Sequence, residues 1–387
     1  MFSKRTGWGL SPNHFTEAYR ELQSAGIKLL DLTISNPTRA GLRYSAEAIL
    51  ESLRNPAALD YDPQPKGLLS AREAVVGYYR EGHNAAVDPE SLVLTTSTSE
   101  GYSHVLRLLC NPGDEILVPK PSYPLFEYLA DLQDVTLVPY PLIYDHGWQI
   151  DFHLLTQEVN ERTRGIVLVH PNNPTGSFVR IAEQEELNKF CRSHDLALIV
   201  DEVFLDYAHD GHRRQTFAAN EEALTFTLSG LSKTSGLPQM KLSWILTSGP
   251  SQKATTALDR LEIIADTFLS VNAPIQLAAP VLMEQRHAIQ PPLLERIRKN
   301  LVSLDDQLSV QAACSRLQVE GGWYVALRVP ATGSDEDLAI EIMRKARVTV
   351  YPGHFYDFPG DGYLVLSLIT AEQEFREGIR RIMTFLA

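Results

Sequence analysis

Short apolar segments alternate with amphipathic segments through the middle of the chain. The apolar runs cover residues 115–118, 165–169, 196–200 and 224–228, and a helical pattern over residues 181–194 separates two of them. Strands that read as continuous apolar runs are buried on both faces, and their alternation with helices is typical of parallel βαβ units. The pattern therefore predicts an α/β domain built on a large, doubly wound, mostly parallel sheet.

Helical patterns also lie on the N-terminal side of this region. Ser11 followed by Pro12 is typical of a helix start, and apolar residues at helical spacing continue from there to Gly26. Two further helices are expected over residues 68–81 and 97–110, where apolar positions recur every three or four residues.

The pattern changes after about residue 280. A charged helical segment over residues 292–310 leads into short apolar strands at 323–329 and 348–351, and a last helix is expected over residues 372–386. Strands and helices in this order predict an α+β domain that is smaller than the first. We expect the N-terminal residues to return and pack against it.

The length of the chain agrees with two domains. At 387 residues, it exceeds the size at which a single hydrophobic core usually stops growing. We expect a large domain over residues 41–285. The small domain would be built from both chain termini, residues 1–40 and 286–387.

Composition and charge restrict the classes of function. With 44% hydrophobic and 21% charged residues, the chain reads as a soluble globular protein. A formal net charge of -13 argues against a nucleic-acid or anionic-membrane partner, because both require a basic surface. Cys110, Cys191 and Cys314 are far apart, and they form neither a disulfide framework nor a zinc motif.

Hydropathy and cysteine usage predict a cytoplasmic location. The first 15 residues lack the apolar region of a secretory signal. No uncharged stretch approaches the ~20 residues that a membrane helix needs. Three separated cysteines fit a reducing compartment. Metal-ligand spacings such as HExxH do not occur in the sequence, so no metal site is expected.

Polar residues follow the predicted strands at the edge where parallel sheets bind ligands. Ser97, with Glu100 three residues later, has the spacing of a capping box. The free backbone amides of such a helix start bind phosphate, although an ordinary cap without a ligand has the same sequence. Asn172 and Asn173 follow another strand, in a segment that also reads as an ordinary proline-rich turn.

An acid and a base complete this group of residues. Asp201 directly follows a wholly apolar run, where a carboxylate is costly unless it is paired. Lys233 lies among small residues at the mouth of the strand over 224–228, and an exposed surface lysine is the ordinary alternative. A phosphate-binding helix start, a buried carboxylate and a lysine at one sheet edge together fit a phosphorylated pyridine aldehyde bound through a Schiff base.

Seven short motifs strengthen this interpretation. They are SNP at 35–37, Tyr61 with Gly67, TSTSEG at 96–101, PSYP at 121–124, NNPTG at 172–176, DEVF at 201–204 and SK at 232–233. In these motifs, and over nearly the whole chain, the sequence resembles the fold-type I pyridoxal-phosphate (PLP) enzymes, specifically the class I and II aminotransferases. The resemblance implies PLP as the cofactor and the fold-type I architecture.

The resemblance assigns roles to individual residues. Lys233 matches the lysine that forms the imine with PLP and then moves a proton as a general base. Asp201 matches the partner of the pyridinium nitrogen, which makes the ring an electron sink. Asn173 matches the donor to the ring oxygen O3′ and is also a substrate-binding candidate, and Tyr123 matches the aromatic residue stacked on the ring.

The phosphate of PLP is expected at the start of the helix near residue 97. Thr98 and Ser99 match the amides that bind it, with Ser97 and Ser232 beside them. Tyr61 matches a tyrosine that reaches the phosphate in a neighbouring subunit. The resemblance therefore implies a homodimer with shared active sites.

Three positions depart from the family pattern around the cofactor. Lys241 stands where the family has a phosphate-binding arginine, so the charge is kept but the two-pronged guanidinium is lost. The serine that usually precedes the lysine by three residues is Gly230. Phe204 replaces a tyrosine that donates to O3′, and that hydrogen bond is expected to be missing.

A fourth departure affects the substrate. Val365 stands where the family carries the arginine that holds the substrate α-carboxylate. Substrate contacts are expected instead from the segment that lines this side of the pocket in the family, with Ser35, Asn36 and Arg39 as candidates. Arg43 belongs to the same segment, and an ordinary surface position is the alternative for both arginines.

The sequence therefore predicts a PLP-dependent aminotransferase that moves an amino group between an amino acid and a 2-oxo acid by a ping-pong mechanism. Specificity for aspartate or glutamate is not expected, because the arginine of dicarboxylate-specific relatives is also missing. Two alternatives stay open: other PLP chemistry on this scaffold, such as β-elimination or a biosynthetic cyclisation, and a binding protein without catalysis. His170 and His354 lie in predicted loops and are not assigned to catalysis.

Overall fold

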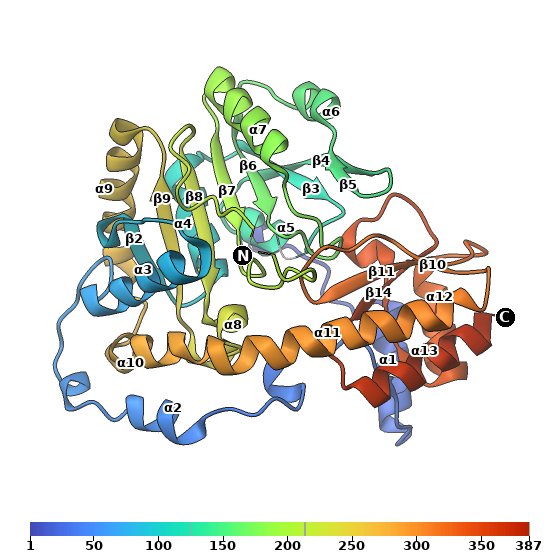
Figure 1. The fold of residues 1–387 in the computed structure, drawn as a ribbon. Helices are drawn as coiled ribbons and strands as arrows, with labels where there is room; N and C mark the ends of the chain where they lie inside the picture. The colour runs from blue at the N-terminus through green and yellow to red at the C-terminus, as the bar shows by residue number, and fades with distance from the viewer. Residues whose placement is uncertain (125, 213, 387) are drawn as a thin grey trace.

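An eight-stranded mixed sheet forms the centre of the larger part of this computed structural model, which describes residues 1–124, 126–212 and 214–386 (Figure 1). Its strands lie in the order β2 (Leu92–Thr95), β9 (Ser243–Ser248), β8 (Thr225–Gly230), β7 (Ala197–Asp201), β6 (Thr163–Val169), β3 (Glu115–Lys120), β4 (Thr136–Tyr144) and β5 (Trp148–Ile150). From β8 to β4 the neighbours are parallel, whereas β9 pairs antiparallel with β8 and β2, and β5 pairs antiparallel with β4. The predicted α/β fold class is confirmed.

Helices cover both faces of this sheet (Figure 1). The helices packed on the sheet are α3 (Leu69–His83), α4 (Thr98–Leu109), α5 (Phe126–Asp131), α6 (Phe152–Gln157), α7 (Ile181–His194) and α9 (Ser251–Phe268). Helix α10 (Ala273–Glu284) packs on α3, α2 (Ala46–Ser52) packs on α10, and the short α8 (Leu231–Thr234) follows β8. Successive side chains of a strand point to opposite faces. Val167 and Ile199 therefore pack in one cluster with residues of α4 and α9, whereas Leu198 and Val200 pack with residues of α7.

The smaller part is an α+β arrangement made from both ends of the chain. It contains α1 (His14–Ser24), β1 (Leu30–Asp31), α11 (Arg286–Ser309), β10 (Ser315–Arg316), β11 (Tyr324–Arg328), α12 (Asp335–Glu341), β12 (Val348–Thr349), β13 (Tyr351–Pro352), β14 (Tyr363–Ser367) and α13 (Glu372–Leu386). Strands β10, β11, β14 and β13 form one antiparallel sheet, and β1 pairs in parallel with β12. The division into domains at residues 41–285 stays a prediction.

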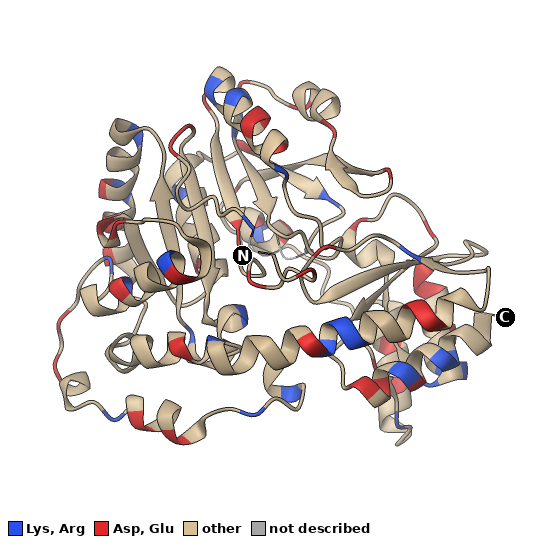
Figure 2. Ribbon diagram, in the orientation of Figure 1, with Lys and Arg blue, Asp and Glu red and all other residues tan. Residues whose placement is uncertain are grey.

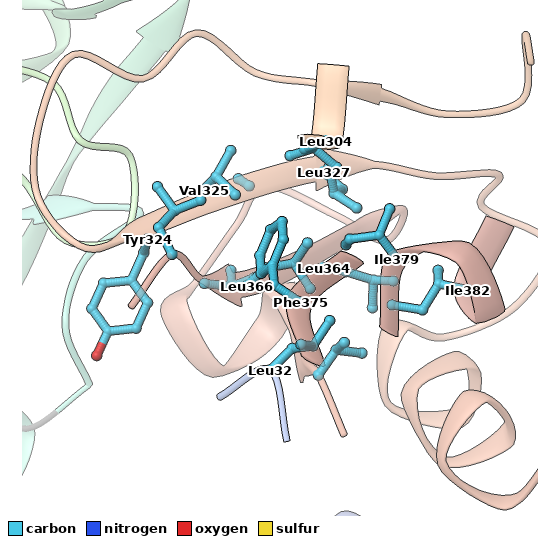
Figure 3. Close-up of a cluster of buried hydrophobic side chains, with 14 of the residues drawn as sticks. Leu32, Leu304, Tyr324, Val325, Leu327, Leu364, Leu366, Phe375, Ile379 and Ile382 are labelled. Atoms are coloured by element: carbon cyan, nitrogen blue, oxygen red, sulfur yellow. The ribbon is translucent and has the colours of Figure 1, made fainter. Parts of the chain in front are cut away.

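The core of the smaller part joins segments that are far apart in the sequence (Figure 3). Leu32 from the N-terminal segment, Leu366 of β14 and Phe375 of α13 belong to one buried cluster. Tyr324 of β11 starts in the same cluster but directs its ring away from the other labelled side chains. With this orientation Tyr324 also lines the cavity that contains Lys233.

Helix α11 connects the two parts and begins earlier than the sequence predicts. It starts at Arg286 rather than at residue 292, so Pro291 and Pro292 lie inside it. A proline inside a helix leaves the carbonyl four residues earlier without its partner. Here those carbonyls belong to His287 and Ala288, which are exposed, so water can satisfy them.

Other element boundaries also differ from the prediction. The first helix begins at His14, because the side chain of Asn13, and not that of Ser11, accepts the hydrogen bond from the Thr16 amide. The single strand predicted over 348–351 is divided into β12 and β13. Strands β4, β5 and β9 were not predicted, because their sequences are not the continuous apolar runs on which the prediction relied.

Charged residues lie mainly on the outer helices and loops, and both signs are mixed along α11 and α13 (Figure 2). The strands of the large sheet are almost free of charge in the same view. Among the described residues, no helix is both long and apolar enough to cross a membrane.

Candidate active site

The predicted chemistry meets at a cavity of about 490 Å³ at one edge of the large sheet. Strands β2, β6, β7 and β8 all end at this edge, so the residues that follow them line one space. Most of the predicted residues are found there: Ser35, Ser97, Thr98, Ser99, Tyr123, Asn173, Asp201, Ser232 and Lys233.

Asp201, the last residue of β7, supplies the negative charge of the cavity. Its carboxylate accepts hydrogen bonds from the backbone amide of Val203 at 3.0 Å and from the hydroxyl of Tyr102 at 3.2 Å. Burial raises the pKa of Asp201 to about 6, while these two hydrogen bonds and the charge of Lys233 lower it. Because the carboxylate is buried, it can pair more strongly with a cationic group of a ligand than an exposed carboxylate could.

Lys233 lies in the short helix α8, directly after β8. Its Nζ is 4.7 Å from the ring centre of Trp323 and 5.6 Å from that of Phe204. Burial among these groups lowers the pKa of Lys233 from 10.5 to about 8, and the charge of Asp201 acts in the opposite direction. A lysine with a lowered pKa is suited to Schiff-base formation and to proton transfer near neutral pH.

The start of α4 is arranged as an anion site. The hydroxyl of Ser97 accepts a hydrogen bond from the amide of Glu100, as a helix cap does. The predicted capping box is half formed, because the side chain of Glu100 reaches the amide of Thr96 at 2.7 Å instead of the amide of Ser97. The free amides and the hydroxyls of Thr98 and Ser99 therefore remain beside the cavity.

The turn after β6 contains two asparagines, of which one stabilises the turn and the other lines the cavity. Asn172 donates to the carbonyl of Pro121 at 3.0 Å and to the hydroxyl of Thr175 at 2.9 Å, so it holds the turn together. Asn173 lines the cavity, and its buried Oδ1 has no hydrogen-bond partner among the described residues. The side chain of Asn173 is therefore placed where a molecule bound in the cavity can contact it.

Gly230 and Ser243 explain one departure from the family pattern. The two residues are paired in adjacent strands at the end of β8, and both line the cavity. A Cβ at position 230 would lie 2.1 Å from Ser243 Oγ, so a serine there would clash. The hydroxyl of Ser243 occupies this side of the cavity instead. Sequence reasoning missed Ser243, because only the pairing of β8 with β9 brings it to the site.

The other half of the cavity is aromatic. Phe204 is buried and packs edge-on against Trp323, with their ring centres 5.2 Å apart. The smaller part of the chain adds Tyr324, Tyr351, Phe355 and Tyr356 to the lining. Trp323, Tyr324 and Tyr351 are not assigned to the site by the sequence analysis. Their position depends on how the two parts pack, which no local pattern encodes.

Several predicted residues lie outside this cavity. Lys241 is exposed and in a left-handed conformation, and Asn36 uses its side chain to cap the short turn Pro37–Arg39 that contains Arg39. Tyr61 is 80% exposed and lines a second cavity of about 620 Å³. The roles given to Lys241, Asn36, Arg39 and Tyr61 therefore stay predictions.

The two histidines that were not assigned to catalysis occupy different positions. His170 is buried between the rings of Phe178 and Phe217, and it is hydrogen-bonded to the carbonyl of Gln215 and the amide of Val179. Burial lowers its pKa to about 4, so it remains neutral near pH 7. His354 is exposed and does not line the cavity that holds Lys233.

These residues fit PLP by their chemistry. The lysine amine can bind the aldehyde, and the carboxylate of Asp201 can pair with the pyridine nitrogen. The start of α4 offers donors to a phosphate, and the amide of Asn173 lines the same cavity. None of the ion pairs between described residues uses Lys233, so its amine is available.

Comparison with known proteins agrees with this chemistry. Residues 7–382 match the model of the family described as aminotransferase class I and II. Glutamate-pyruvate aminotransferase AlaA of Haemophilus influenzae is 27% identical over 379 residues, which cover 96% of this chain and 93% of that protein. Its counterpart in Escherichia coli strain K12 is 32% identical over 276 residues, covering 71% of this chain and 65% of that protein.

A solved structure gives the same fold. Alanine aminotransferase from Pyrococcus furiosus has a TM-score of 0.89 at 22% identity, covering 100% of this chain and 99% of that one. A match of the family model over nearly the whole chain defines the class of protein. The chain belongs to the class I and II aminotransferase family, and it is a PLP-dependent transaminase of fold type I.

The lowered pKa of Lys233 predicts a pH-dependent cost to the stability of the apoprotein. Between pH 8 and 10.5 the unfolded chain binds more protons at Lys233, so stability rises with pH there, and the full cost is present below pH 8. Lys233→Met removes the charge but keeps the length. It should raise the free energy of unfolding of the apoprotein by about 1–3 kcal/mol at pH 7. This advantage should shrink as the pH rises from 8 to 10.5.

Urea denaturation of the apoprotein at several pH values measures this effect. Lys241→Met is the matched control, because Lys241 is exposed. The free energy of unfolding of this variant should equal that of the wild type. A Lys233→Met variant that is less stable than the wild type at pH 7 would contradict the proposed cost of burial.

Proposed function

We propose that this enzyme is a cytoplasmic, homodimeric transaminase in which Lys233 binds the cofactor and moves the proton, and Asp201 pairs with the pyridine nitrogen. The observation that supports the proposal most strongly is that both side chains line one cavity at the edge of the sheet. Ser97, Thr98, Ser99, Ser232 and Ser243 would hold the phosphate, Asn173 the ring oxygen and Tyr123 the ring face.

The cofactor, when bound, supplies an electron sink for negative charge on the substrate α-carbon. The buried carboxylate of Asp201, which accepts hydrogen bonds from Tyr102 and Val203, would keep the pyridine nitrogen protonated. Once its amine is free, Lys233 Nζ would accept the proton from the substrate α-carbon and deliver it to C4′, the former aldehyde carbon of the cofactor. Its lowered pKa lets a useful fraction of the amine be neutral near pH 7.

The substrate side of the cavity favours a neutral amino acid over a dicarboxylate. Among the described lining residues, Lys233 carries the one cationic side chain. Val365, at the position of the family's arginine, is fully buried in β14. Ser35 and Tyr324, which both carry a hydroxyl group, line the cavity instead. We propose that they meet the substrate carboxylate.

The names of the relatives suggest the second substrate. Glutamate-pyruvate aminotransferase is named for glutamate and pyruvate, and alanine aminotransferase is named for alanine. We propose that pyruvate or another small 2-oxo acid accepts the amino group here. The aromatic lining supports an apolar or aromatic amino acid as the donor, because such side chains are favoured where water is excluded.

Two half-reactions followed separately test this function. Purified holoenzyme mixed with a panel of apolar, aromatic and acidic amino acids should convert its bound cofactor to the amine form, with release of the matching 2-oxo acid. Pyruvate alone should then reverse the change in absorption. Asp201→Asn should slow the first half-reaction about 10²–10⁴-fold, because the neutral amide cannot hold the nitrogen protonated.

The control is Asp145→Asn, which changes an exposed carboxylate and should leave the rate unchanged. Release of pyruvate and ammonia without the amine form would assign the enzyme to β-elimination instead. An Asp201→Asn variant as fast as the wild type would contradict the role proposed for Asp201.

The homodimer is supported by the second cavity. It is lined by residues 57–65, 67–68, 269–274 and 276–277, with Leu94 and Ala265. The exposed apolar side chains of Leu59 and Leu269 belong to this lining. Apolar patches of this kind mark protein interfaces. The hydroxyl of Tyr61, on this surface, would donate a hydrogen bond to the cofactor phosphate bound in the partner subunit.

Tyr61→Phe should leave the dimer intact in analytical ultracentrifugation but weaken PLP affinity about tenfold, because a hydrogen bond to a charged group is lost. Leu59→Asp should shift the protein toward the monomer. A wild-type monomer with full activity, or a Tyr61→Phe dimer with unchanged affinity for PLP, would count against shared active sites.

A further inference from the structure

The turn that carries Lys233 is held by side chains from three other segments. Helix α8 has only four residues, so its last carbonyl groups have few partners within the helix. The hydroxyl of Tyr207 donates to the carbonyl of Lys233 at 2.7 Å, and the amide of Gln290 donates to the carbonyl of Thr234 at 2.8 Å. The hydroxyl of Tyr44 donates to the carbonyl of Gly236 at 2.7 Å.

Gln290 is fixed by a second hydrogen bond. The same Nε2 that donates to Thr234 also donates to Asp206 Oδ2 at 2.8 Å, so both amide hydrogens are used. The side chain of Asp206 is only 9% exposed. A hydrogen bond from a neutral donor is stronger when the acceptor is a buried carboxylate than when it is an uncharged group.

The remaining partners of Asp206 come from α3. His83 Nε2 lies 3.0 Å from Asp206 Oδ1, and the hydroxyl of Tyr78 lies 3.2 Å from the same oxygen. Glu202, on the loop that carries Asp206, turns its carboxylate to Thr216 and Phe217 instead. Asp206 therefore links α3 of the large part to Gln290 of α11 through hydrogen bonds.

Gln290 also lies where α11 passes from one core to the other. Before it, Arg286 forms ion pairs with Glu81 and Glu284 beside the large part. After it, Leu293 belongs to the core of the smaller part. Helix α11 touches the lysine turn directly, since a Cβ on Gly236 would lie 2.9 Å from Ile289 Cγ2. Figure 1 shows α8 beside the start of this long helix.

We propose that Gln290 is a positioning residue for the transamination reaction: through its hydrogen bonds to Asp206 and to the carbonyl of Thr234, it fixes the Lys233 turn and links that turn to α11. The proposal rests on the function proposed for Lys233. A displacement of α11 relative to the large sheet changes the position of Lys233 Nζ, because the backbone one residue after the lysine is attached to the helix.

Gln290→Met tests this link, because it keeps the length and packing of the side chain and removes both amide hydrogens. The maximum rate of the first half-reaction should fall about tenfold to a hundredfold, as expected for a small displacement of a reacting group. The amino acid concentration that gives half of the maximum rate should change less than about twofold. In the apoprotein, backbone hydrogen exchange over residues 231–237 should become about tenfold faster.

Gln307→Met is the matched control. Gln307 lies on the same helix and also donates to a backbone carbonyl, that of Arg376, but away from the site. It should change neither the rate nor the exchange over residues 231–237. If Gln290→Met fails to fold, Gln290→Leu serves as the second variant, because it is apolar, unbranched at Cβ and without donors.

The outcomes are distinguishable from those for the proposed function. If the Lys233→Ala variant has the same absorption spectrum of bound cofactor as the wild type, the role of Lys233 is wrong. The role of Gln290 is then wrong as well. A wild type that depends on Lys233, together with a folded Gln290 variant whose rate and exchange both match the wild type, would overturn the role of Gln290 alone.

Discussion

Burial of a carboxylate and an amine together at the edge of an apolar sheet is the constraint on which this structure depends. Either charge alone would cost several kcal/mol in such surroundings. The pKa of Asp201 is raised to about 6 and that of Lys233 is lowered to about 8, and each is moved back toward its usual value by the charge of the other. Hydrogen bonds from Tyr102 and Val203 complete the support of the acid. The apolar strands that bring these residues together also create the low-polarity environment that tunes them.

The cavity is completed by parts of the chain that are distant in sequence. Ser35 comes from the N-terminal segment, and Tyr324 and Tyr351 come from strands of the smaller part. Their arrangement requires the N-terminal segment and the C-terminal residues to share the core that Leu32 and Phe375 occupy. The substrate side of the site is therefore sensitive to how the two parts pack, whereas the cofactor side is fixed by the large sheet.

Features with a local signal could be predicted from the sequence. Helices α7 and α13 have the predicted bounds, and β7 and β8 end within two residues of theirs, because apolar periodicity is local. Contacts between distant segments could not be predicted in this way. Gln290 meets Thr234 across 56 positions, and Ser243 reaches the site through strand pairing alone. Lys241 and Tyr61 match family positions in sequence but lie away from the cavity of the single chain.

The most direct test of the central claim is to locate the cofactor on the chain. Reduction of the holoenzyme with borohydride fixes an imine between PLP and a lysine, and peptide mass spectrometry then identifies the modified residue. The account predicts one modified lysine per chain, at Lys233, and none in a Lys233→Ala variant. Modification at another lysine, or PLP bound without any lysine being modified, would contradict it.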